Sequence, residues 1–232
     1  MKRILLLPAA LGLTLAASGC FNPFFPTVLT ERVTSAAPSP TTPENAVKLF
    51  EWCWENRGVQ EYEGLFTADY IFQSAETDSA GNPTRTVLTH RDDEVETAQN
   101  MFVGSAERPP ATKISLTFDR NLHAFSDTRL GKDPGWHRAI RTSVDLKVEV
   151  DDGNQYAVQG YALFYLTRGD SALIPADQTA LGVKRDSLRW WIDRWEDETI
   201  SQANVVAGRG AKPSGLVIQK TMEQVKAIFL GR

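Results

Sequence analysis

The sequence of 232 residues is poor in cysteine and histidine, the side chains that most often fix a structure through a disulfide or a metal. It has two cysteines, Cys20 and Cys53, and three histidines. Cys20 lies near the N-terminus, outside the predicted domain, so we expect a fold that depends on its hydrophobic core and no structural disulfide. Cys53 lies between two tryptophans on a predicted helix and is expected to be a small buried hydrophobic residue. The histidines are far apart, and no pair has the spacing of metal ligands, so no metal site is predicted.

The sequence also lacks an excess of positive charge and a phosphate-binding loop. The formal net charge is -4, and basic and acidic residues are interspersed, so we expect no nucleic-acid partner. The glycines of "GLFTADY" and "GRGAKPSG" do not follow a strand and open a helix, as phosphate loops do, and no cofactor is predicted. Hydrophobic residues make up 42% and charged residues 23%, which is typical of a globular protein.

The apolar run at residues 4–16 is too short for a membrane-spanning helix, which needs roughly 20 residues. It follows a positively charged start and precedes small residues, and this order predicts a cleaved signal peptide over residues 1–19. The segment "ASGC", residues 17–20, resembles the lipobox of bacterial lipoproteins, which implies that Cys20 carries acyl chains, palmitate among them, that anchor the protein to a membrane. The alternative is an ordinary signal peptide with an incidental cysteine. Phe21 stands where an aspartate often marks retention at the inner membrane, so the cell envelope is predicted, with the periplasmic face of the outer membrane favoured.

Residues 20–42 are predicted to be a tether, because they are rich in proline, serine and threonine without apolar periodicity. Residues 43–232 are predicted to form the domain, which includes a C-terminal tail with a short helix. Apolar residues at helical spacing predict helices over 43–57, 59–66, 91–103 and 220–230. "DYIFQSA" predicts a short strand, and the polar residues 76–89 predict a loop.

Alternating apolar residues predict strands over 112–125, 140–150 and 155–166, with "DDGN" as a hairpin turn. In "RWWIDRWEDE", Arg189 to Glu198, tryptophans fall on both faces of the expected strand, which predicts a wall that is covered on both sides. The order of these elements predicts an α+β fold.

The segments "NAVKLFEWCWENRGVQEYEGLFTADYIFQ", "RDDEVETAQNMF" and "WWIDRWEDE" resemble the SnoaL-like branch of the NTF2-like superfamily, and in particular its lipid-anchored members from bacterial envelopes. The resemblance covers residues 43–200. It implies a cone in which three helices pack on a strongly curved antiparallel sheet, with a cavity at the open end. It also implies a possible homodimer through the outer face of the sheet.

Large aromatic side chains are expected to line this cavity and to contact a small apolar ligand: Phe72, Phe118, Tyr161, Tyr165 and Trp190. The alternative is that these rings fill the cone. We therefore predict a non-enzymatic lipoprotein that binds a small apolar ligand or an envelope protein.

The competing prediction is an enzyme. Enzymatic members of the superfamily place an aspartate inside the cone, so the resemblance leaves open an isomerase, cyclase or dehydratase that uses a buried Asp. The candidates are Asp119, Asp145 and Asp193, with His123 as a possible partner. Each lies on the polar face of its predicted strand, which is more typical of solvated charges, and no catalytic residue is assigned.

The lipid anchor is tested by metabolic labelling with palmitate. The wild-type protein should take up the label and Cys20→Ala should not, because the thiol and the freed amine of Cys20 are the predicted acylation sites. Label retained on Cys20→Ala would contradict the anchor, and Cys53→Ala, which should label like the wild type, is the matched control.

Overall fold

The computed structural model describes residues 36–77, 83–169, 176–180, 182, 188–200 and 216–230. The chain divides into two compact units, Met1–Ser35 and Ala36–Arg232. The signal peptide, Cys20 and most of the tether fall in the first unit, outside the described residues. Within the described ranges, no helix is long and apolar enough to cross a membrane.

The second unit has five helices among its described residues, and they agree with the predicted helical segments apart from one short addition. These helices are α1 (Pro43–Asn56), α2 (Val59–Glu63), α3 (Arg91–Phe102), α4 (Ala176–Ala180) and α5 (Met222–Leu230). Thr42 caps α1 because its hydroxyl accepts the backbone N–H of Asn45 at 3.1 Å, and Pro43 opens the first turn. The predicted second helix is shorter than expected, because Phe66 already begins a strand.

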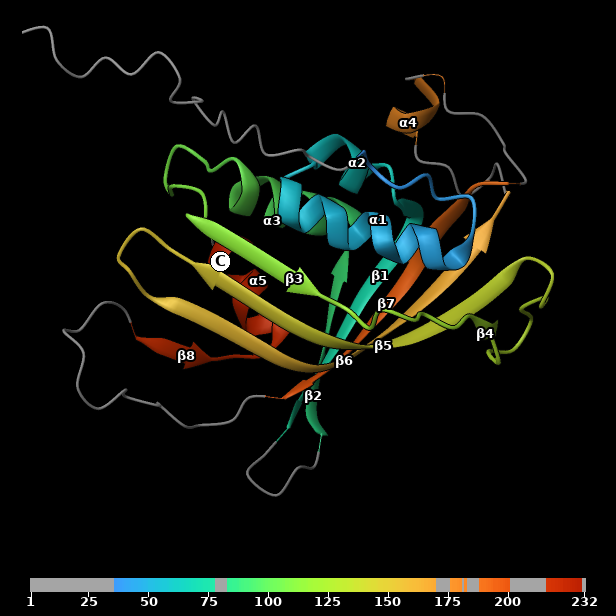
Figure 1. Cartoon of the computed structure of the whole chain (residues 1–232). Helices are drawn as coiled ribbons and strands as arrows, with labels where there is room; N and C mark the ends of the chain where they lie inside the picture. Colours follow the sequence, from blue (N-terminus) through green and yellow to red (C-terminus); the bar gives the residue numbers. More distant parts are fainter. Residues whose placement is uncertain are drawn as a thin grey trace, which may run out of the picture. The chain divides into compact units, whose positions relative to one another are not determined.

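The strands form one mixed sheet. They are β1 (Phe66–Thr77), β2 (Pro83–His90), β3 (Lys113–Thr117), β4 (Phe125–Ser126), β5 (His137–Glu149), β6 (Gln155–Arg168), β7 (Trp190–Ile200) and β8 (Val217–Gln219). Their order is β2-β1-β7-β6-β5-β3, with β4 beside β5 and β8 beside β6. The long strands β5 and β6 bend along their length, and α1, α2 and α3 lie together on one side of the sheet (Figure 1). The predicted α+β class, with helices on a curved sheet, is confirmed.

The sheet differs from the prediction in its strand directions. Strands β5, β6 and β7 are antiparallel in succession, as expected, but β1 runs parallel to β7, and β8 runs parallel to β6. Each parallel pair joins strands that are distant along the chain or connected by a long crossover, for which a hairpin pattern gives no signal.

Two predicted boundaries were wrong. Residues 76–89, expected as a loop, contain most of β2, which pairs with β1 at the edge of the sheet. Its polar composition reflects solvent exposure, since the side chains of residues 86–90 are exposed or half-buried. The strand expected over 112–125 ends at Thr117, because the chain then turns toward α1, where Glu51 accepts the backbone N–H of Phe118 at 3.0 Å and Glu44 accepts that of Ala124 at 3.2 Å.

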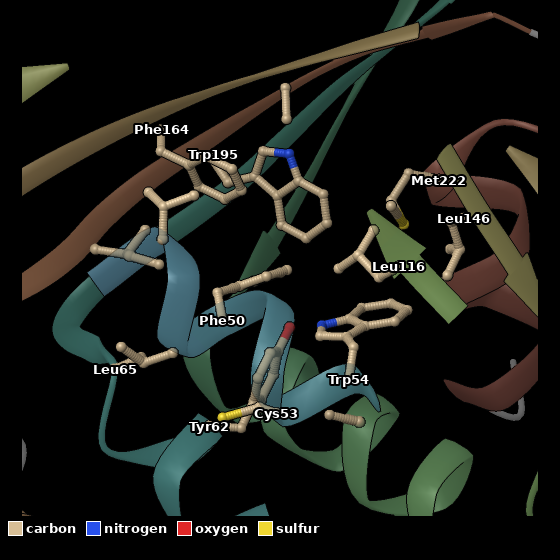
Figure 2. Close-up of a cluster of buried hydrophobic side chains, with 14 of the residues drawn as sticks. Phe50, Cys53, Trp54, Tyr62, Leu65, Leu116, Leu146, Phe164, Trp195 and Met222 are labelled. Carbon is tan, nitrogen blue, oxygen red and sulfur yellow. The ribbon is translucent and has the colours of Figure 1, made fainter. Parts of the chain in front are cut away.

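The core lies between α1 and the inner face of the sheet and is dominated by aromatic rings (Figure 2). Phe50 is at its centre, fully buried, with ring centroids of Tyr62 and Trp195 each 5.2 Å away and that of Phe164 at 5.3 Å. Cys53 is buried on the same helix, as predicted. Aromatic pairs at such separations add to the free energy gained from burying their apolar area.

Gly160 near the middle of β6 allows a close approach of two backbones. Its φ is +143°, and a Cβ built there would lie 2.6 Å from the Cα of Thr199 on β7. Only glycine avoids this contact, so the spacing between β6 and β7 at this point depends on the missing side chain.

Gly160→Ala should therefore lower the free energy of unfolding by about 2–3 kcal/mol, through backbone strain and the clash with Thr199. Gly153→Ala is the control, because Gly153 also has a positive φ, +82°, but open space around its Cβ position. Urea denaturation of both variants checks the prediction. Equal losses in the two variants would show that the close approach of β6 and β7 is not the cause.

Candidate functional site

Helix α3 carries, on its side toward the sheet, a carboxylate that is almost completely shielded from solvent. Glu94, in the first turn of α3, is 1% exposed. Its Oε1 accepts the hydroxyl of Tyr62 at 2.6 Å, and its Oε2 accepts the hydroxyl of Tyr70 at 3.3 Å. Lys226 on α5 donates to Oε2 and forms an ion pair with it. A buried charge is tolerated only when partners of this kind replace water.

The ammonium group of Lys226 is also enclosed by aromatic rings. Its Nζ lies 3.5 Å from the ring centroid of Phe72 and 3.9 Å from that of Trp195. These two rings come from paired positions of β1 and β7 and contact each other with centroids 4.8 Å apart. A cation over the face of an aromatic ring is attracted by the ring quadrupole, and most strongly so when it is desolvated. We call the five side chains that surround Lys226 and its counter-ion, with Glu94 itself included, the Lys226 cage: Tyr62, Tyr70, Phe72, Glu94 and Trp195.

Burial dominates the electrostatics of the cage. It lowers the pKa of Lys226, although the Glu94 carboxylate acts in the opposite direction. Burial, and then the charge of Glu94, raise the pKa values of Tyr62 and Tyr70 well above their ordinary range, so both phenols keep their protons and donate them to Glu94. Asp197, farther along β7, has a pKa raised by burial, and hydrogen bonds from Thr199 and the Glu223 backbone act against that shift.

The five aromatic residues predicted to contact a ligand do not share one location. Phe72 is in the Lys226 cage, and Phe118 is buried beside Phe50, with ring centroids 6.0 Å apart. Trp190 is 5% exposed at the start of β7, where the guanidinium of Arg168 lies 5.5 Å from its ring centroid.

Tyr161 and Tyr165 lie on the opposite, outer face of β6, because their neighbours Ala162 and Phe164 point into the core. The guanidinium group of Arg141 lies over the ring of Tyr161, with its Cζ 3.8 Å from the ring centroid, and that of Arg129 lies over the ring of Tyr165 at 3.9 Å. Ligand contact by these aromatic residues therefore stays a prediction.

The acidic candidates for catalysis lie elsewhere. Asp119 is exposed and accepts the backbone N–H of Ser143 at 2.8 Å, while Asp145 is half-buried and His123 is exposed. The expectation of a solvated charge fails for Asp193, which is 7% exposed.

Asp193 is the extra residue of a β-bulge in β7, since Leu166 pairs with Ile192 and Tyr165 with Arg194. The segment between β4 and β5 places two cations over it: Arg129 at 3.0 Å and Lys132 at 2.9 Å. Arg129 also binds Asp127 at 2.7 Å, so these charges form a network that ties the segment to the outer face of the sheet. Asp193 is buried, but on the side of the sheet away from the Lys226 cage.

Sequence reasoning missed both Glu94 and Lys226, although a signal for each was present. Glu94 is followed on the same helical face by Ala98 and Met101, which are buried. Lys226 stands four residues after Met222 and three before Phe229, on the apolar stripe of α5. A charged residue on an apolar stripe predicts a buried charge with a partner.

A separate open pocket of about 880 Å³ lies between the end of α3 and α5. It is lined by Glu96, Asn100, residues 105–108, Gln224 and residues 227–230. None of the predicted site residues lines it. Within the described ranges, no group of three or more His, Cys, Asp or Glu side chains is placed to hold a metal ion.

Comparisons with known proteins give matches at the level of structure. No protein family matches the sequence, and no curated protein does. The hexachlorocyclohexane dehydrochlorinase LinA-type3 of Novosphingobium barchaimii LL02 is similar with 9% identity over 74% of this chain and 92% of that chain, at a TM-score of 0.44. A ketosteroid isomerase-like protein of Erwinia carotovora atroseptica SCRI1043 has 12% identity over 68% and 94%, at 0.40.

An NTF2-like protein of unknown function in nutrient uptake from Rhodospirillum rubrum ATCC 11170 has 9% identity over 68% of this chain and 98% of that chain, at a TM-score of 0.42. These names cover an enzyme, an enzyme-like protein and a protein of unknown function. The function of this chain is therefore argued from its own side chains.

Removing the charge of Glu94 should leave the ammonium of Lys226 buried without its counter-ion. Glu94→Gln is expected to lower the free energy of unfolding by about 3–5 kcal/mol, and Glu94→Gln/Lys226→Met should recover much of the loss, because both charges are then absent. Glu96→Gln, an exposed position on the same helix, is the control and should cost less than about 0.5 kcal/mol. Urea denaturation measures all three. A double variant as unstable as Glu94→Gln would show that the ion pair is not what couples α3 to α5.

Proposed function

We propose that the protein is a non-enzymatic bacterial lipoprotein, anchored through acyl chains on Cys20, that binds an envelope protein through the outer face of its sheet. The proposal rests on a difference between the two faces of the sheet: the aromatic rings of the inner face are buried, whereas the outer face has an exposed one. The rings on the inner face pack against one another around Phe50, at centroid separations of 5.2–6.4 Å. On the outer face, Tyr161 is 45% exposed.

The outer face combines exposed apolar and cationic groups across three adjacent strands. Arg141 on β5 stacks on Tyr161 of β6 and forms an ion pair with Glu198 of β7 at 2.7 Å. Leu163 and Ile200 belong to the same face, and Ile200 is 56% exposed. We call Arg141, Tyr161, Leu163, Glu198 and Ile200 the outer patch. Tyrosine and arginine are enriched in protein interfaces, where large apolar side chains provide most of the binding free energy and charges set the register.

The interior supports the other candidate functions less well. A small apolar ligand would have to displace rings such as Phe72 and Phe118, which are buried and in contact with their neighbours. General acid or base catalysis would require a carboxylate that is free to exchange a proton with a substrate, and the carboxylate of Glu94 is engaged by Tyr62, Tyr70 and Lys226. Both considerations favour recognition by the outer patch over chemistry on the inner face of the sheet.

Site-specific photo-crosslinking in intact cells tests the proposal. A benzophenone amino acid in place of Tyr161 should give an adduct with an envelope protein, whereas the same group in place of Leu130, which is fully exposed between β4 and β5, should not. Ile200→Asp should abolish the adduct at position 161, because it adds an uncompensated charge within the outer patch, while Leu130→Asp should leave it unchanged.

An adduct of twice the protein's own mass would assign the outer patch to a homodimer and would contradict the envelope partner. An adduct that survives Ile200→Asp would also count against the proposal, since contact would then not depend on the outer patch.

A further inference from the structure

Burying the ion pair between Glu94 and Lys226 in an aromatic core costs a large desolvation free energy. Both side chains must give up their hydration, and a pair of apolar side chains of similar volume often stabilises a protein at least as well. The surroundings on the inner face are apolar and aromatic, so apolar side chains would be compatible with them. The polar groups that converge there therefore need a reason other than stability.

The groups of the Lys226 cage are those that bind an alkylammonium ion. Phe72 and Trp195 present ring faces to the cation at 3.5 and 3.9 Å, and Glu94 supplies the counter-charge. Aromatic ring faces attract an ammonium group through the ring quadrupole, and a carboxylate strengthens its hydrogen bonds through charge. Phe72 and Trp195 have interplanar angles of 71°, so they enclose the cation from two directions.

The side chains of the cage all come from elements other than the helix that carries the lysine. They belong to α2, α3, β1 and β7, and Tyr62 and Tyr70 donate hydrogen bonds to the Glu94 carboxylate. Lys226 comes from α5, near the end of the chain. Three other residues of α5, Met222, Val225 and Phe229, are also buried in the core, so the lysine is not the only contact of this helix with it.

We propose that the Lys226 cage is a binding site for a primary alkylammonium ion, and that Lys226 is its intramolecular occupant in the free protein. The ligand class is a small primary amine whose cation has an unbranched apolar stem of three or four carbons, the shape of the lysine side chain that the cage encloses. Binding of such an amine in place of Lys226 links occupancy of the cage to the position of α5. This site lies on the inner face, so its test is independent of the outer patch.

The test removes the occupant and supplies it as a separate molecule. Lys226→Ala deletes the atoms from Cγ to Nζ, which correspond to n-propylammonium. Added propylammonium should raise the melting temperature of this variant by roughly 3–6 °C at about ten times its Kd. Neutral 1-propanol, which has the same length, should give less than a third of that shift, since it lacks the charge that Glu94 and the two rings recognise.

Two control variants define the site. Lys220→Ala removes a lysine that lies 5.5 Å from the ring of Tyr156 outside the cage, and its melting temperature should not respond to propylammonium. Lys226→Ala/Glu94→Gln keeps the cavity but removes the counter-charge, and the response should be lost. Equal stabilisation by propylammonium and 1-propanol, or a response that persists without the Glu94 charge, would overturn the proposal.

If Lys226→Ala does not fold by itself, the same comparison is made by refolding from urea. A yield of folded protein that rises with propylammonium and not with 1-propanol supports the site, and failure to recover with either compound overturns it.

Discussion

The buried charge of Glu94 is the constraint on which much of the inner structure depends. A carboxylate at 1% exposure needs hydrogen-bond donors and a counter-ion, and the chain supplies them from Tyr62, Tyr70 and Lys226. These partners belong to α2, β1 and α5, which are distant from one another in sequence. Meeting the requirements of one carboxylate therefore fixes how the C-terminal helix packs against α3 and the sheet, and Phe229 and Asn100 reinforce that contact through a hydrogen bond of 3.0 Å.

The rest of the inner face is stabilised by the packing of rings around Phe50. This packing depends on shape and, unlike a hydrogen bond, is not directional. Because rings are large and stiff, they fill the space between α1 and the curved sheet efficiently, but they do not select a register. Register comes from features with stricter geometry: the bulge at Asp193, the close backbone approach at Gly160, and the cage. The apolar core thus provides most of the burial, and a few polar or backbone constraints decide which arrangement is adopted.

The sequence predicted correctly those features that depend on residues close together in the chain. The cap at Thr42, the stripe of α1 and the hairpin between β5 and β6 all follow from spacing of a few residues. The tryptophans on both faces of β7 correctly indicated a strand that is covered on both sides at its start, whereas its end at Ile200 is exposed. The sequence did not predict features that depend on contacts between residues far apart in the chain. The parallel pairing of β1 with β7 is specified by contacts across more than a hundred residues, and Asp193 is buried only because Arg129 and Lys132 are brought over it. Glu94 and Lys226 could be recognised as anomalies on apolar stripes, but not as partners of each other.

Strand β7 connects the two faces on which the proposals rest. Trp195 points inward to Lys226, while Glu196 and, two residues later, Glu198 point outward, and Glu198 binds Arg141. Successive side chains of a strand point to opposite faces, so Trp195 on the inner face is flanked in sequence by Arg194 and Glu196 on the outer face. The Met222 N–H donates to Thr199 at 2.9 Å, which ties the start of α5 to the same strand one residue after Glu198. Strand β7 therefore contributes side chains both to the Lys226 cage, through Trp195, and to the outer patch, through Glu198 and Ile200.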